Sequence, residues 1–248
     1  MTIYTQNPTG GRSVKIFKTE DRLCSNKEHW YHDSDSEAKF RQNLQRTPSD
    51  WKYRTETITY KNNSLGYRTK EFNKINWKKS IVVLGCSLVY GVGVSEEDTI
   101  ANQLSEITGH YVVNMGVSGS SGQFAVHNLA CLLEYYKPKA IAIGWADASR
   151  VPLYLKDRTI HCGSWRDDPA GLGLAMRCYD WHSQSVLQLQ QLIARQMGMT
   201  ADFTLFKSVE NIMDVPYCPI IDHGRDLSHG GVKTYNNVAT CIAEQLSL

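Results

Sequence analysis

The chain has 248 residues, of which 42% are hydrophobic, enough to bury the core of one large α/β domain. Its formal charge of +2 at pH 7 is too small to favour a nucleic-acid partner through long-range attraction. No apolar run approaches the roughly 20 residues that a membrane span needs, so no membrane partner is expected.

The N-terminus and the cysteines bear on the compartment. Residues 1–8 contain no basic stretch followed by an apolar one, so we expect no signal peptide. The seven cysteines are odd in number, and some lie in apolar runs such as residues 129–133. This pattern is typical of buried free thiols, so we expect a reducing, cytoplasmic location.

Residues 1–50 are polar and irregular, apart from a possible short helix at 38–44. Residues 51–59 alternate with a period of two, which predicts a β-hairpin or ribbon before the main sheet. We therefore expect residues 1–76 to form an N-terminal arm and β-ribbon, packed on a core domain of residues 77–248.

The core domain begins with strands that alternate with helices. Residues 81–84, 111–114 and 139–144 are apolar runs that predict buried strands. A helix is expected to begin at Ser95, with acidic residues in its first turn, and to end at Gly109. With a second helix over 123–136, this order implies right-handed crossovers and a parallel α/β sheet.

The second half of the core domain is less regular. The pattern dissolves over residues 146–180, and long loops in compact domains are usually functional or mobile. Helices are predicted over 181–197 and 232–248. Candidate later strands cover 203–206 and 219–221, with a short helix between them.

Four chemically interesting segments follow predicted strands. They are Ser87, residues 114–122, residues 144–147 and residues 226–230. The carboxyl ends of parallel strands meet at one edge of a sheet, where ligands bind, so we expect all four to gather there.

These segments contain the parts of an acyl-transfer site. The Ser87 hydroxyl needs a neighbouring imidazole to take its proton, and His229 can be that base. Asp226, three residues earlier, can fix the imidazole tautomer and stabilise the imidazolium. The backbone N–H groups of Ser87 and Gly119 are candidate donors to the oxyanion.

Three blocks resemble those of the SGNH (GDSL-type) hydrolase superfamily: Gly85-Cys86-Ser87-Leu88 with Gly91, Asn114-Met115-Gly116-Val117-Ser118-Gly119, and Asp226-Leu227-Ser228-His229. Upstream, residues 63–68 are similar to a segment that precedes the first block in some members. The resemblance implies a flavodoxin-like three-layer α/β/α fold and esterase, lipase or carbohydrate-deacetylase chemistry without a cofactor. It also implies that Ser87 is the nucleophile, that Gly119 is an oxyanion donor, and that Asp226 and His229 complete the triad.

Two departures from the superfamily pattern bear on activity. Cys86 stands where the first block usually has Asp, beside the nucleophile but outside the triad. Residues 144–147 stand where the superfamily has a further block, Gly-x-Asn-Asp, and Ala146 takes the place of its Asn, which usually donates to the oxyanion. Either backbone donors suffice, or the Trp145 indole or Arg150 substitutes, or catalysis is weak or absent. We predict that Trp145, Asp147 and Arg150 bind substrate, and that residues 146–180 wall the pocket.

Simpler interpretations of the same residues remain open. His229 could be a surface histidine, His223 beside Asp222 could be a competing base, and Cys86 could be a nucleophile or a buried apolar residue. The aromatic residues of 30–77 could stack on sugars, although such residues more often pack an extension onto a core.

Two cofactor sites are disfavoured by spacing. His161-Cys162 with Cys178 and His182 could suggest zinc, but adjacent ligands suit tetrahedral geometry poorly. Gly116, Gly119 and Gly122 suggest a phosphate cradle, but no Gly-Lys-Ser/Thr follows. The sequence therefore predicts a serine-dependent ester hydrolase, and its resemblance to the superfamily implies a small acyl ester, such as an acetylated carbohydrate, as the substrate. A non-catalytic glycan- or protein-binding module and an O-acyltransferase are the alternatives.

Overall fold

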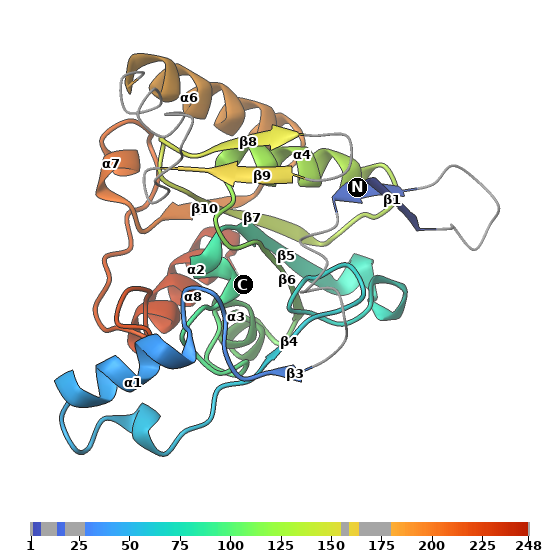
Figure 1. Ribbon diagram of the computed structural model, residues 1–248. Helices are drawn as coiled ribbons and strands as arrows, with labels where there is room; N and C mark the ends of the chain where they lie inside the picture. The colour runs from blue at the N-terminus through green and yellow to red at the C-terminus, as the bar shows by residue number, and fades with distance from the viewer. Residues whose placement is uncertain (1, 6–13, 18–27, 155–158, 164–179, 248) are drawn as a thin grey trace.

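In the computed structural model, the described residues are 2–5, 14–17, 28–154, 159–163 and 180–247. The centre is a four-stranded sheet in the order β10-β7-β5-β6, and all its neighbouring strands are parallel (Figure 1). The strands are β5 (Ser80–Gly85), β6 (Tyr111–Gly116), β7 (Ala140–Trp145) and β10 (Ala201–Thr204). All six residues of β5 are buried, because this strand has neighbours on both sides and helices on both faces.

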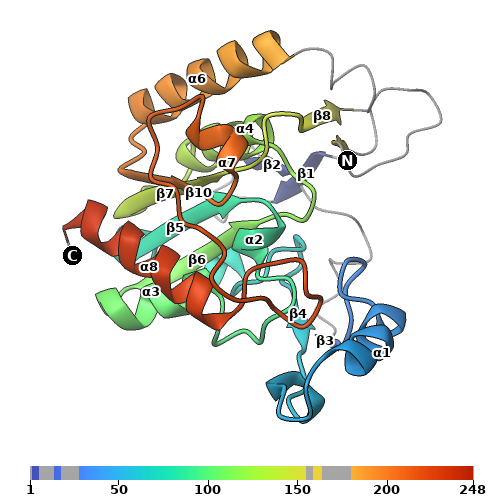
Figure 2. The same ribbon diagram turned by 90° about the vertical axis from the view of Figure 1, so that its left-hand side faces the viewer.

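Helices cover both faces of the sheet (Figure 2). On one face, α3 (Ile100–Thr108) and α8 (Val232–Leu246) bury apolar residues such as Leu104 and Val238. On the other, α4 (Gly122–Leu133) and α6 (Asp180–Gln196) bury residues such as Leu129 and Leu187. The predicted α/β class with three layers is confirmed.

The predicted start of α3 is wrong by one turn. Thr99, not Ser95, caps the helix, and its side-chain oxygen accepts from the Asn102 N–H. The Ser95 hydroxyl instead bonds to the carboxylates of Glu56 and Asp98, at 2.8 and 3.1 Å. A Ser followed by acidic residues predicts a helix cap, but here the Ser95 hydroxyl donates to Glu56 of the N-terminal segment.

The N-terminal segment contains antiparallel pairs, but not where the sequence predicted a ribbon. Strand β1 (Thr2–Thr5) pairs with β2 (Val14–Phe17), and the short β3 (Glu28–His29) pairs with β4 (Tyr60–Lys61). The alternating stretch 51–59 instead contains a 3₁₀ turn, η2 (Lys52–Arg54). Tyr53 packs with Ile58 in a small buried core, whereas Thr55 and Thr57 are exposed, so the alternation corresponds neither to strand pairing nor to one buried face.

The other N-terminal elements are short. Helix α1 (Glu37–Arg46) matches the predicted helix, and its cap is Ser36, whose hydroxyl accepts from the Lys39 N–H. Two 3₁₀ turns, η3 (Phe72–Lys74) and η4 (Trp77–Lys79), lead into β5.

The second half departs from prediction in two places. Within the predicted loop, β8 (Val151–Tyr154) and β9 (Thr159–Cys162) form an antiparallel pair. Residues 219–221 are not a strand: a single bridge joins Thr204 to Tyr217 just before them. Pro219 has no N–H to extend the pairing, so the chain leaves the sheet there. The predicted short helix is α7 (Lys207–Glu210).

None of the described helices is both long and apolar enough to cross a membrane. Five cysteines lie in the described part of the chain, all as free thiols: Cys86, Cys131, Cys162, Cys218 and Cys241. Cys24 and Cys178 fall outside it.

Candidate active site

Ser87 begins the short helix α2 (Ser87–Tyr90), directly after the turn at the end of β5. The neighbouring β6 approaches this helix so closely that a Cβ on Gly116 would lie 2.2 Å from the Tyr90 backbone nitrogen. The Asn114 amide donates to the Val89 carbonyl at 3.0 Å, which ties β6 to α2. The sheet and the loop between β6 and α4 (residues 117–121, the second loop) therefore fix the position of Ser87.

His229 and Asp226 meet Ser87 across this edge of the sheet. His229 Nε2 lies 2.9 Å from Ser87 Oγ, and His229 Nδ1 lies 2.6 Å from Asp226 Oδ2. The other carboxylate oxygen of Asp226 accepts the backbone N–H groups of Ser228 and His229, each at 3.0 Å. The three side chains thus form a hydrogen-bonded row of hydroxyl, imidazole and carboxylate, called the relay below, and its catalytic role stays a prediction.

Burial and charge suit the three side chains to this order. Asp226 is fully buried, Ser87 is 5% exposed, and the His229 side chain is 16% exposed. Burial alone would raise the pKa of Asp226, but hydrogen bonds and the nearby imidazole of His229 outweigh it and hold that pKa below its usual value. Asp226 therefore remains a carboxylate at neutral pH and can orient the imidazole.

The candidate oxyanion donors are backbone N–H groups. Ser87 N–H is at the first position of α2, where a helix has no acceptor of its own for it. Gly119 has a φ of +77°, a conformation that side-chain-bearing residues rarely adopt. Within the described residues, neither N–H donates to a protein acceptor.

Residues 144–147, where Ala146 replaces the usual Asn, supply no side-chain donor to the oxyanion. Ala146 is 1% exposed and packs in the core under α8. The Trp145 indole N–H donates to Asp202 Oδ2 at 3.1 Å, and Trp145 is itself 1% exposed. The predictions that Trp145 binds substrate or replaces the missing Asn donor do not fit this burial. Its large apolar ring completes the core beneath the site.

Asp147 and Arg150 lie beside the second loop. Arg150 Nη1 donates to the Ser120 carbonyl at 3.3 Å, one residue from Gly119, and its guanidinium lies over the Phe206 ring. Asp147 accepts from Ser149 and Ser208. Burial raises the pKa of Asp147, yet the hydrogen bonds from these serines outweigh it and lower that pKa overall. A substrate role for both residues stays a prediction.

The rival interpretations receive little support. His223 Nδ1 contacts the backbone oxygen of His229 at 3.3 Å, and the neighbouring Asp222 accepts from residues at the start of α8. Cys86 is 2% exposed in the core. Among the described residues, no group of three His, Cys, Asp or Glu side chains could hold a metal; Cys178 and the His182 side chain lie outside them.

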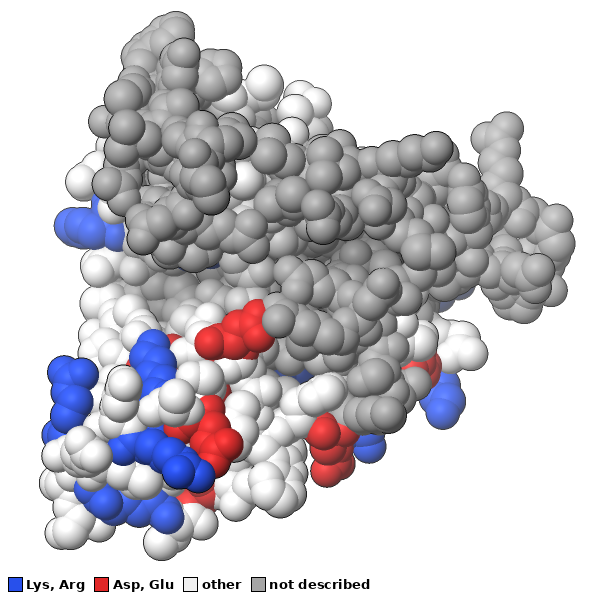
Figure 3. Space-filling view, viewed as in Figure 1, with Lys and Arg blue, Asp and Glu red and all other residues white. Residues whose placement is uncertain are grey.

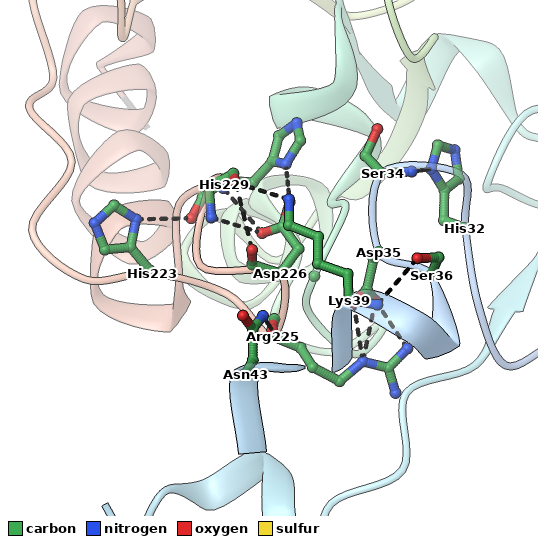
Figure 4. Close-up of polar contacts among 12 residues, drawn as sticks. His32, Ser34, Asp35, Ser36, Lys39, Asn43, His223, Arg225, Asp226 and His229 are labelled. Atoms are coloured by element: carbon green, nitrogen blue, oxygen red, sulfur yellow. Dashed lines mark hydrogen bonds and ion pairs between the residues drawn. The ribbon is translucent and has the colours of Figure 1, made fainter. Parts of the chain in front are cut away.

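Sequence reasoning missed the residues that hold the Asp226 loop. Arg225 pairs with Asp35, and the Asn43 amide donates to the Arg225 carbonyl at 2.9 Å (Figure 4). Lys39 extends from α1 to the same loop (Figure 4). The partners lie 182–190 positions apart in the chain, so no local pattern could have indicated them.

No family model matches the chain, and no curated protein matches its sequence. Several solved structures are similar to it. A G-D-S-L lipolytic protein from Veillonella parvula is 12% identical over 66% of this chain and 96% of its own, with a TM-score of 0.41. The esterase EstA from Pseudoalteromonas is 15% identical over 68% and 100%, with a TM-score of 0.41. A variant of a Geobacillus acetyl-xylooligosaccharide esterase is 12% identical over 71% and 97%, with a TM-score of 0.40.

Proposed function

We propose that the protein is a serine-dependent hydrolase of carboxylic esters. The observation that carries this proposal is the unbroken relay of Ser87 Oγ, His229 and Asp226, at 2.9 and 2.6 Å. These separations lie within the range in which a base can take the proton of a nucleophile.

In the first step, His229 Nε2 takes the proton of Ser87 Oγ as that oxygen attacks the ester carbonyl. The proton then passes from His229 to the leaving alcohol, and the acyl group stays on Ser87. Water, deprotonated by His229, then attacks the acyl-enzyme; the bond from the acyl carbon to Ser87 Oγ breaks, His229 returns the proton to Ser87 Oγ, and the acid is released. Asp226 keeps Nδ1 as the donor nitrogen, so that Nε2 faces Ser87 with a free lone pair.

The tetrahedral intermediate carries an oxyanion, and the backbone N–H groups of Ser87 and Gly119 are its proposed donors. The oxyanion would then have two backbone donors and no donor from an Asn side chain. Because one such donor is typically worth about 10²–10³ in rate, a site that lacks the Asn donor should be slower.

A small acyl ester, with acetylated carbohydrates first, is the proposed substrate class. Its support is the resemblance of the three sequence blocks to a superfamily that includes carbohydrate deacetylases; fold-level likeness alone does not select a substrate. Asp147 and Arg150, beside the second loop, are the proposed polar contacts.

Two other functions are compatible with the same fold. A non-catalytic module that binds a glycan or a protein is favoured by Ala146, which has no donor. An O-acyltransferase would use the same relay but pass the acyl group to a sugar hydroxyl. The transferase differs only in what attacks the acyl-enzyme.

Hydrolysis of p-nitrophenyl acetate and release of acetate from acetylated xylo-oligosaccharides test the proposal. We expect turnover by the wild type and its loss, by about 10⁴-fold or more, in Ser87→Ala. Ser105→Ala is the matched control, since Ser105 lies in α3, outside the relay, and its hydroxyl donates to the His110 carbonyl after that helix. Equal turnover in wild type and Ser87→Ala would defeat the proposal. Acetyl transfer to added sugars without net hydrolysis would select the transferase.

A further inference from the structure

Lys39 brings a positive charge from the N-terminal segment to the relay. Its Nζ donates to Ser228 Oγ at 2.9 Å and lies 3.7 Å from Asp226 Oδ2. That carboxylate oxygen is the one that accepts from His229 Nδ1. The Lys39 side chain is 36% exposed and Asp226 is fully buried, so the ammonium sits at the solvent side of the carboxylate (Figure 4).

A buried ion pair fixes α1 relative to the loop. Arg225, the residue before Asp226, directs Nε and Nη2 at the Asp35 carboxylate, with the closest contact at 2.8 Å. The two side chains are 4% and 0% exposed. The Tyr60 hydroxyl also donates to Asp35, at 2.5 Å, and accepts the Gly93 N–H. The ion pair therefore fixes the part of the backbone from which Lys39 extends towards the loop.

The surface around α1 carries charges of both signs (Figure 3). Among them is the exposed pair of Arg41 with Glu37, whose side chains are 74% and 53% exposed. Lys39 differs because its nearest carboxylate is buried and belongs to the relay. A charge beside a buried group is screened far less than one between exposed groups.

We infer that Lys39 is a positioning residue of the active site, which anchors the Asp226–His229 loop and balances the negative charge of Asp226. This inference rests on the proposed function, since it assigns Lys39 to that relay. The N-terminal segment then completes the site and is not an appendage.

Few other charges face His229, so the effect of Lys39 should be measurable. Asp226 faces Nδ1, His223 contacts its backbone oxygen, and the Arg225–Asp35 pair contributes opposite charges. From α8, Tyr235 lies near Asp226 and Cys86; burial raises the Tyr235 pKa well above its usual value, so that this hydroxyl stays neutral. Lys39 is thus the cation of α1 that lies beside the relay.

Removing this cation should let the imidazole take up a proton at higher pH, since the Asp226 charge is then unopposed. The experiment is an NMR titration of the imidazole C2–H of His229 in the full chain, assigned with His229→Gln. In Lys39→Met and in Lys39→Gln, which keeps an N–H donor but no charge, the midpoint should rise by about half a unit to one unit. About 1 M salt should reduce the difference from wild type.

Lys39→Arg should restore the wild-type midpoint, and Arg41→Met, on the same helix but paired with Glu37, should leave it unchanged. A merely structural role for Lys39 predicts equal midpoints in all these proteins, and that result would overturn the inference. The titration does not depend on turnover. A protein that hydrolyses no ester but shows the shift would defeat the proposed function and keep the charge assignment. Normal turnover without the shift would support the proposed function and overturn the role of Lys39.

Discussion

The two halves of the relay are supported in different ways. Ser87 is held by the sheet itself, through the close approach of Gly116 and the amide of Asn114. The loop that carries Asp226 and His229 follows no strand of the sheet, and a segment about 190 positions earlier holds it through Asp35. Ser87, the proposed nucleophile, is therefore part of the scaffold, whereas the position of His229, the proposed base, depends on a distant part of the chain.

Substitutions in the two regions should therefore have different effects. Damage near Ser87 should disturb the sheet and the site together. Loss of the N-terminal contacts should make the position of His229 less fixed while the sheet stays intact. The substitutions below test this difference, from the largest expected effect to the smallest.

The first concerns the base. His229→Gln removes the proposed base for the Ser87 proton, and we expect kcat for p-nitrophenyl acetate to fall by about 10⁴-fold or more. The control is His223→Gln, because His223 contacts only the backbone oxygen of His229 and should retain most of the rate. If both histidines affected kcat equally, the assignment of the base would be wrong.

The second concerns the buried ion pair. Asp35→Asn leaves the Arg225 guanidinium, 4% exposed, without its carboxylate. Loss of one partner of a buried pair typically costs about 3–5 kcal/mol in the free energy of unfolding, measured here by urea denaturation. Glu37→Gln breaks the exposed pair with Arg41 and should cost about 1 kcal/mol or less. Similar losses in the two variants would show that the N-terminal segment does not anchor the loop.

The third concerns the oxyanion donors. Gly119→Ala places a side chain at a φ of +77° and displaces the N–H, so kcat should fall by about 10²–10³-fold. Gly109→Ala imposes a similar strain at a φ of +67°, with no atom within 4 Å of the new Cβ, at the end of α3. It should lower stability but not kcat. An unchanged rate in Gly119→Ala would remove Gly119 from the site.

The smallest effect concerns Asp222 and pH. Its carboxylate accepts the N–H groups of Lys233 and Thr234 at the start of α8, and these hydrogen bonds outweigh burial and lower its pKa. A carboxyl whose pKa is lowered by folding adds stability at neutral pH, which is lost as the pH falls below about 4. Asp222→Ala should therefore destabilise the protein by about 1 kcal/mol at pH 7.

The same linkage gives the check on this last variant. The difference in melting temperature between Asp222→Ala and wild type should shrink as the pH falls towards 3, because protonation removes the same interaction from the wild type. A difference that stayed constant with pH would mean that the carboxylate charge is not what stabilises the start of α8.

The sequence could predict the strands that hold Ser87, but not the contacts between distant segments that hold the Asp226–His229 loop. The strands around Ser87 are continuous apolar runs, so their order and the edge that carries the loops could be inferred. Asp226 and His229 were predicted as partners because they are three residues apart, a local signal. Asp35, Lys39 and Arg225 gave no such signal, because their contacts arise only when distant segments pack. Trp145 was misjudged for the same reason, since its acceptor Asp202 lies on another strand.

The central claim is that Ser87 is a nucleophile activated by His229. Intact-mass spectrometry of the full-length protein after treatment with a fluorophosphonate tests it most directly. We expect one covalent adduct, mapped to Ser87 by peptide sequencing, and slow or negligible labelling of His229→Gln under the same conditions. A wild-type protein that gains no adduct, or gains it at a residue other than Ser87, would contradict the account.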